Sequence, residues 1–121
     1  MMDNQIWINN ILSAIKELSD VQYQTKVWLE GKGTEVSSFD EAICRLFDDY
    51  ELDSFIEKFS SMEQVSLKKI VLLKKYREEL TNYLSTLKDE VSIEQLITDP
   101  AWKKLCQLAK ETYDNLNDSY K

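Results

Sequence analysis

Residues 38–59 read SFDEAICRLFDDYELDSFIEKF, and this stretch decides the fold class. It opens with a capping box, in which Ser38 takes the N-cap position of a helix and Glu41 the third helical position. Apolar residues then recur every three or four positions, which is the period of a helix that buries one side. That first apolar stripe consists of Phe39, Ala42, Ile43, Leu46, Phe47 and Tyr50. We expect a break at 48–51 and then a second short helix that buries Leu52, Phe55, Ile56 and Phe59.

The same helical period extends to both sides of this stretch. It predicts a first helix over 3–18, a long central helix over about 62–88 that opens at a second capping box (Ser61–Gln64), and a short turn over 92–97. A last helix should start at Asp99-Pro100, because proline is favoured directly after an N-cap residue. The chain has only two glycines and one proline, whereas β-sandwiches need frequent turn residues. We therefore predict one all-α domain over residues 1–121, a compact orthogonal bundle of five to six helices with a polar, frayed tail from about 117.

Residues 20–30 allow two interpretations. Asp20 is a good N-cap for a second helix running to Leu29. Alternation of Val21, Tyr23, Thr25, Val27 and Leu29 instead fits a strand. We favour the helix, because a single strand in a helical domain has no pairing partner.

Most of the net charge lies between Asp40 and Glu57. Those 18 residues hold seven acids and one base, Arg45, whereas the other 103 residues hold 15 acids and 14 bases. The segment therefore contributes −6 of the net −7. An acidic segment that also carries aromatic residues can fold and still project a concentrated negative field.

Composition also excludes several classes of function. The chain has no histidine, which excludes catalytic schemes built on a Ser–His or Cys–His pair. An acidic protein is a poor ligand for nucleic acid, because that affinity comes mainly from neutralising phosphates. We expect no cofactor, no membrane span and no secretory signal, and we expect a cytoplasmic protein. Cys44 and Cys106 are too few for a disulfide framework, and we expect both to be small buried residues.

Three roles for the acidic segment remain open. It can face an external basic protein, for which the candidate binding residues are Glu41, Asp48, Asp49, Tyr50, Glu51, Asp53, Glu57, Tyr23 and Trp28. It can be neutralised internally by the bases Lys68, Lys69, Lys74, Lys75 and Arg77. It can also hold Mg²⁺ through Asp48, Asp49, Asp53 and Glu57, as in an all-helical nucleoside triphosphate pyrophosphatase, a class of phosphohydrolase.

The long helix also offers a route to self-association. Leu67 and Val71 lie off its main apolar stripe and would leave apolar surface for a homodimer.

The segment SFDEAICRLFDDYELDSFIEKF resembles the acidic helical region of small bacterial immunity proteins. The resemblance covers chain size, helix content and the acidic–aromatic composition. It implies a non-catalytic inhibitor whose carboxylates occlude the cationic groove of a toxin, such as a nuclease, with aromatic side chains as anchors. Nuclease-colicin immunity proteins carry a Tyr-Tyr pair on that surface, and this chain has no such pair. We therefore expect a protein-interaction module and carry over no individual residue.

Overall fold

The computed structural model describes residues 4–31, 38–61, 67–87 and 92–118, and every regular element in these ranges is helical. The α-helices are α1 (Asn4–Ser19), α2 (Val21–Gln24), α3 (Phe39–Cys44), α4 (Leu52–Ser60), α5 (Leu67–Ser85), α6 (Ile93–Thr98) and α7 (Pro100–Asp118). Two π-helical segments, η1 (Thr25–Leu29) and η2 (Arg45–Asp49), directly continue α2 and α3. The all-α prediction is confirmed.

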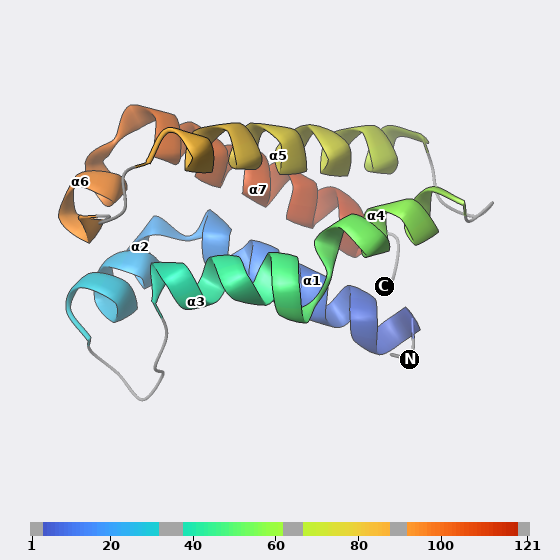
Figure 1. Ribbon diagram of the computed structural model, residues 1–121, viewed down its shortest axis with the longest axis horizontal. Coiled ribbons are helices and arrows are strands. Elements are labelled where there is room, and N and C mark those ends of the chain that lie inside the picture. Colours follow the sequence, from blue (N-terminus) through green and yellow to red (C-terminus); the bar gives the residue numbers. More distant parts are fainter. Residues whose placement is uncertain (1–3, 32–37, 62–66, 88–91, 119–121) are drawn as a thin grey trace.

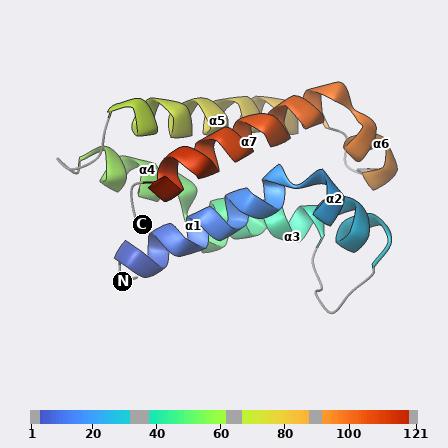
Figure 2. The same ribbon diagram turned by 180° about the vertical axis from the view of Figure 1, so that it is seen from behind.

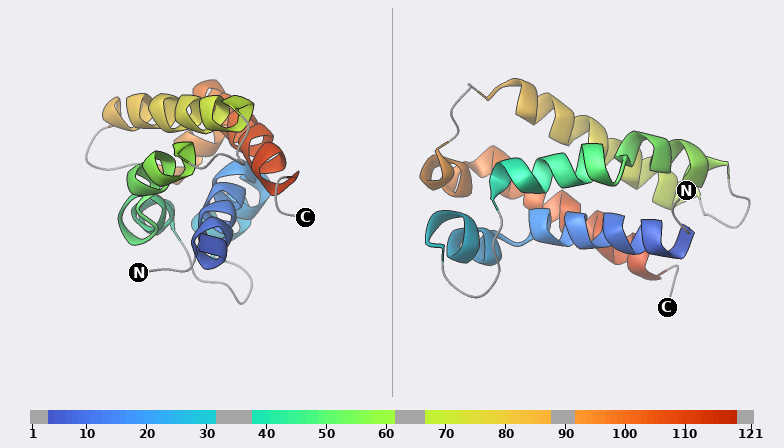
Figure 3. Two further views of the ribbon diagram at one scale, coloured as in Figure 1. Left: turned by 90° about the vertical axis from the view of Figure 1, so that its right-hand side faces the viewer. Right: turned by 60° about the horizontal axis from the view of Figure 1, so that its bottom comes forward.

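The helices form a compact bundle in which α7 is central to the packing. α7 lies against both α1 and α5, which are its most extensive contacts, and α6 also packs on it. Figure 1 shows α5 and α7 on one side of the bundle and α1 and α3 on the other, with α4 leading from α3 up to α5. Figure 2 shows from behind that α1 and α7 run lengthwise beside each other. The left view of Figure 3 shows α1 nearly end-on while α5 lies across the view, so these two helices are not parallel.

The core fills the space between these two sides. It includes Trp102 and Tyr76, each about 1% exposed, at the centre of a larger set of aliphatic side chains. The other fully buried apolar residues are Ile11, Ile15, Leu18, Ala42, Leu46, Leu52, Leu73, Leu80, Ala109 and Leu116. Every helix from α1 to α7 except the short α2 contributes at least one buried apolar side chain, and α2 contributes the buried Gln24.

Residues 21–29 are helical, as the favoured interpretation predicted. The Asp20 carboxylate caps this helix by accepting a hydrogen bond from the Tyr23 amide at 3.0 Å. The buried positions are Gln24 and Val27, a spacing of three. The buried face thus includes a glutamine, which explains why an apolar pattern alone looked like a strand.

The other predicted helix starts are also confirmed where the structure describes them. Ser38 accepts from the Glu41 amide at 3.2 Å, and Ser92 accepts from the Gln95 amide at 3.3 Å. The Asp99 carboxylate accepts from the Ala101 amide at 3.0 Å at the start of α7. The predicted capping box at Ser61–Gln64 falls largely on residues 62–64, which lie outside the described residues.

Two boundaries differ from the expectation. The predicted turn at 92–97 is the helix α6, which brings the number of helical segments in the described ranges to seven. The long helix ends at Ser85, a few residues before the predicted end at about 88, whereas its predicted start at about 62 lies outside the described residues. Figure 3 shows α2 and α6 together at one end of the bundle, and α6 packs against η1 there.

The burial predicted for Cys44 is wrong, whereas that for Cys106 is confirmed. Cys44 is exposed and Cys106 is 3% exposed. The side of α3 that faces the core is taken by Phe39, Ala42 and Leu46. Cys44 lies four residues from both Asp40 and Asp48, so it belongs to the solvated side of the helix.

Candidate functional site

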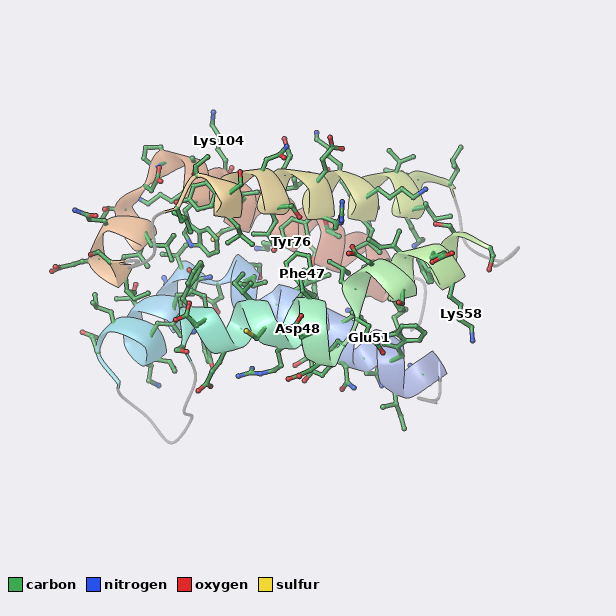
Figure 4. The ribbon with its side chains drawn as sticks, viewed as in Figure 1. Phe47, Asp48, Glu51, Lys58, Tyr76 and Lys104 are labelled. Atoms are coloured by element: carbon green, nitrogen blue, oxygen red, sulfur yellow. The ribbon has the colours of Figure 1, made fainter. Side chains whose placement is uncertain are left out.

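The acidic segment Asp40–Glu57 covers α3, η2 and α4, which follow one another along one side of the bundle. Its large apolar side chains are buried or half-buried, and all seven of its acidic residues are exposed. Figure 4 shows Phe47 directed toward Tyr76 of α5, with Asp48 and Glu51 on the side of the segment away from α5. The segment therefore buries its aromatic side and exposes its carboxylates.

Two of the seven acids are paired within the molecule. Asp53 accepts from Arg77 of α5, with Oδ1 at 2.7 Å from Nε and Oδ2 at 3.4 Å from Nη2. Hydrogen bonding to Asp53 raises the pKa of the Arg77 guanidinium, as expected for a stabilised cation. Glu41 lies 3.6 Å from Arg45 one turn along the same helix. Both pairs are exposed, so each stabilises the fold only weakly.

The other five acids make no ion pair in the described part of the chain. We call this set the acidic surface; it consists of Asp40, Asp48, Asp49, Glu51 and Glu57. Of the five bases that were expected as internal partners, Arg77 alone is seen to pair with the segment. Lys68, Lys74 and Lys75 make no ion pair within the described ranges, and Lys69 donates to the Asn115 carbonyl of α7 at 2.7 Å.

Arg45, the base inside the segment, is directed toward α1. Its Nη1 donates to Glu17 Oε1 at 3.0 Å, and the Glu17 side chain is only 8% exposed. Glu17 also accepts from the indole N–H of Trp28 at 3.0 Å. Because a buried carboxylate shares the charge of Arg45, this base does little to neutralise the acidic surface.

A second polar cluster lies beside Glu17. The buried Gln24 donates to the Glu17 carbonyl at 3.0 Å and accepts from the indole N–H of Trp102 at 2.9 Å. It also contacts Cys106 Sγ at 3.8 Å, and burial raises the pKa of that thiol to about 11. Sequence reasoning missed both clusters. Trp28 and Trp102 were the signal that could have indicated them, because a buried indole N–H needs a polar acceptor nearby.

The backbone is unusual where η2 meets α4. The Tyr50 amide donates to the Arg45 carbonyl at 2.8 Å, and the Tyr50 carbonyl accepts from the Trp7 indole at 2.6 Å. Glu51 then has φ 47° and ψ 60°, in the left-handed region that disfavours residues with a Cβ. Such conformations recur at functional sites, and this one places an acidic side chain beside Tyr50.

Glu51→Gly should therefore stabilise the protein relative to Glu51→Ala by about 1 kcal/mol, because glycine adopts this conformation without steric cost. Both variants remove the same charge, so the comparison isolates the backbone. The measurement is the free energy of unfolding in urea. An alanine variant as stable as the glycine variant would show that the left-handed backbone stores no strain.

The candidate aromatic residues differ in their surroundings. Tyr50 is half-buried and packs against the core beside the acidic surface. Tyr23 is half-buried and lines, together with Arg45 and Glu17, a cavity of about 330 Å³ between α1, α2 and η2. Trp28 packs edge-to-face on Phe39 at 5.9 Å and gives its N–H to Glu17, so its ring belongs mainly to the interior. Of the three candidates, Tyr50 therefore lies beside the acidic surface. Tyr23 lies near Arg45, and Trp28 belongs to the interior.

The acids of the segment do not converge on a metal-binding geometry. Among the described residues, no group of three or more Asp, Glu or Cys side chains is placed to hold a metal ion. The magnesium alternative therefore has no ligand set in those ranges.

Two further features bear on partners. Leu67 and Val71 are 75% and 56% exposed on α5, as their position off the apolar stripe predicted. Across the described helices, none has both the length and the apolar character needed to cross a bilayer.

Comparison with protein-family models places nearly the whole chain in one family. A family model described as "Domain of unknown function (DUF7945)" matches residues 2–120, which is nearly the whole chain. Neither the curated proteins nor the solved structures contain a significant match.

Proposed function

We propose a function for this chain, which belongs to the DUF7945 family: it is a non-catalytic interaction protein that binds a basic partner protein through its acidic surface. The observation that carries the proposal is the set of five exposed carboxylates without an ion pair in the described residues. The class of partner that fits is a toxin with a cationic groove, as the resemblance to immunity proteins implies.

The electrostatic support comes from how the nearby bases are used. Arg45 shares its charge with the buried Glu17, and Arg77 is held by Asp53. The other five carboxylates face solvent and make no ion pair in the described part of the chain. Lys58 of α4 is exposed on the same side as Glu51, so the surface is predominantly negative. A predominantly negative surface accelerates encounter with a basic partner and discriminates against acidic proteins.

The aromatic support comes from Tyr50. Its backbone is fixed by two hydrogen bonds, and its half-buried ring lies next to the left-handed Glu51. A rigid, partly exposed aromatic residue loses little entropy on binding, which is why such residues dominate interface energetics.

The experiment uses two variants of equal net charge. The face variant is Asp40→Asn, Asp48→Asn, Asp49→Asn and Glu57→Gln, which changes the net charge from −7 to −3. The control variant is Glu78→Gln, Glu79→Gln, Glu94→Gln and Glu111→Gln, which are four exposed acids on α5, α6 and α7. Each set contains one acid from the first turn of a helix, Asp40 or Glu94, so the loss of helix-dipole stabilisation is matched.

We expect wild-type protein immobilised on beads to retain a basic protein from a lysate of its source organism. With the purified partner, the face variant should bind roughly 100-fold more weakly and the control variant within about threefold of wild type. Equal weakening of both variants would show that net charge alone matters. An undiminished affinity of the face variant would contradict the proposal.

A further inference from the structure

A second surface feature lies at the end of α1, next to the cavity that Tyr23 and Arg45 line, with which it shares Lys16 and Asp20. A cavity of about 600 Å³ opens between the last turn of α1, the start of α2 and one side of α7. This volume falls within the range of small-molecule sites, roughly 300–1,000 Å³. The acidic surface contributes none of its lining residues.

Three lysines line this cavity. Lys16 comes from the end of α1, and Lys103 and Lys110 come from α7, where they lie seven residues apart and so on one side of the helix. All three are exposed, and none makes an ion pair in the described part of the chain. Because the protein as a whole has a net charge of −7, three lysines around one cavity form a local positive potential, which favours an anionic ligand.

Two carboxylates also line the cavity, and they limit the charge that it accepts. Asp20 is engaged as the N-cap of α2 through the Tyr23 amide, and Asp114 lies toward the far end of α7. Three lysines against two carboxylates leave a net charge of +1. This balance favours a monoanion over a dianion, because a second negative charge would be repelled by Asp20 and Asp114.

Most of the lining area is apolar, although the polar side chains of Ser19, Gln22 and Gln107 also contribute to it. Val21 and Tyr113 are half-buried there, and the aliphatic stems of the lysines extend the apolar wall. Cys106 lies at the base, where burial raises the pKa of its thiol to about 11, so the thiol is uncharged at neutral pH. A fully hydrated inorganic ion gains nothing from these walls, whereas an apolar chain does.

We propose that this cavity binds an amphipathic monocarboxylate, with the carboxylate on Lys103 and Lys110 and the apolar chain against Val21, Cys106 and Tyr113. Lys16 closes the opposite wall from α1. The site is independent of the acidic surface and of the function proposed above.

The test is calorimetric titration with octanoate, inorganic phosphate and octyl glucoside. Octanoate has both a negative charge and an apolar chain, phosphate has only the charge, and octyl glucoside has only the chain. We expect saturable octanoate binding to wild type, and binding roughly tenfold weaker to the double variant Lys103→Gln and Lys110→Gln. Lys104→Gln is the matched control: Lys104 is on the same helix, and Figure 4 shows it projecting away from the bundle. It should bind octanoate within about twofold of wild type. Circular dichroism melts check that each variant is folded.

Three results would overturn the proposal. Octanoate that binds the double variant as tightly as wild type places the ligand elsewhere. If phosphate binds as tightly as octanoate, the cavity recognises a simple anion and not an amphipathic one. If octyl glucoside binds as tightly as octanoate, the charge of the lysines does not contribute to binding. The face variant should bind octanoate like wild type, so failure here is distinguishable from failure of the partner-binding proposal.

Discussion

Trp102→Ala should lower the free energy of unfolding by about 4 kcal/mol, within the range for removing a large buried aromatic residue. Trp102 is 1% exposed, and its ring lies within 5.6–6.5 Å of the rings of Trp28, Phe39 and Tyr83. These partners belong to η1, α3 and α5, so one side chain of α7 joins three other parts of the bundle.

Trp102→Phe separates packing from hydrogen bonding. Phenylalanine keeps much of the ring volume but leaves the side-chain oxygen of Gln24, Oε1, without its donor. We therefore expect the free energy of unfolding to fall by about 2 kcal/mol. Urea unfolding of the three proteins gives both values. A loss below about 1 kcal/mol for the alanine variant would contradict the central position of Trp102.

Glu17→Ala should lower the free energy of unfolding by about 2 to 3 kcal/mol, because Arg45 and the Trp28 indole both lose a buried acceptor. The expected loss is less than for a fully buried ion pair, since the Arg45 side chain is 31% exposed and can turn toward water.

The double variant Glu17→Ala and Arg45→Ala tests the assignment of this loss. If the Glu17–Arg45 pair is the cause, the sum of the losses in the two single variants should exceed the loss in the double variant by about 1 kcal/mol or more. Glu17→Gln retains an acceptor for Trp28 and should lie between wild type and Glu17→Ala. Strictly additive losses would show that the effect of Glu17 does not depend on its pairing with Arg45.

The helix starts were predictable because their signals are local. Ser38, Ser92 and Asp99 each cap within three residues along the chain. The π-helical segments η1 and η2 were not predicted, because π-helices are rare and a helical period in a sequence is therefore interpreted as an α-helix. The burial of Gln24 and the exposure of Cys44 were not predictable either, because both depend on neighbours in the folded structure. A polar residue is buried where Trp102 and Glu17 satisfy it, and a small apolar residue is exposed where larger neighbours take the core positions.

The location of the acidic surface followed directly from the sequence, but its state of pairing did not. Five bases on α5 were available as partners, and the structure shows that Asp53 pairs with Arg77, whereas Lys68, Lys74 and Lys75 make no ion pair with these acids within the described ranges. The choice depends on how α4 is placed against α5, which is a contact between residues 24 positions apart. No local pattern encodes that register.

The most direct measurement is the association rate constant with the purified basic partner at about 50 mM and 500 mM salt, where screening lengths differ several-fold. We predict that wild type and the control variant associate at least about tenfold faster at low salt, and that the face variant loses most of this acceleration. A wild-type rate constant that is indifferent to salt would contradict the claim that the acidic surface recognises its partner. A face variant as salt-dependent as wild type would contradict it equally.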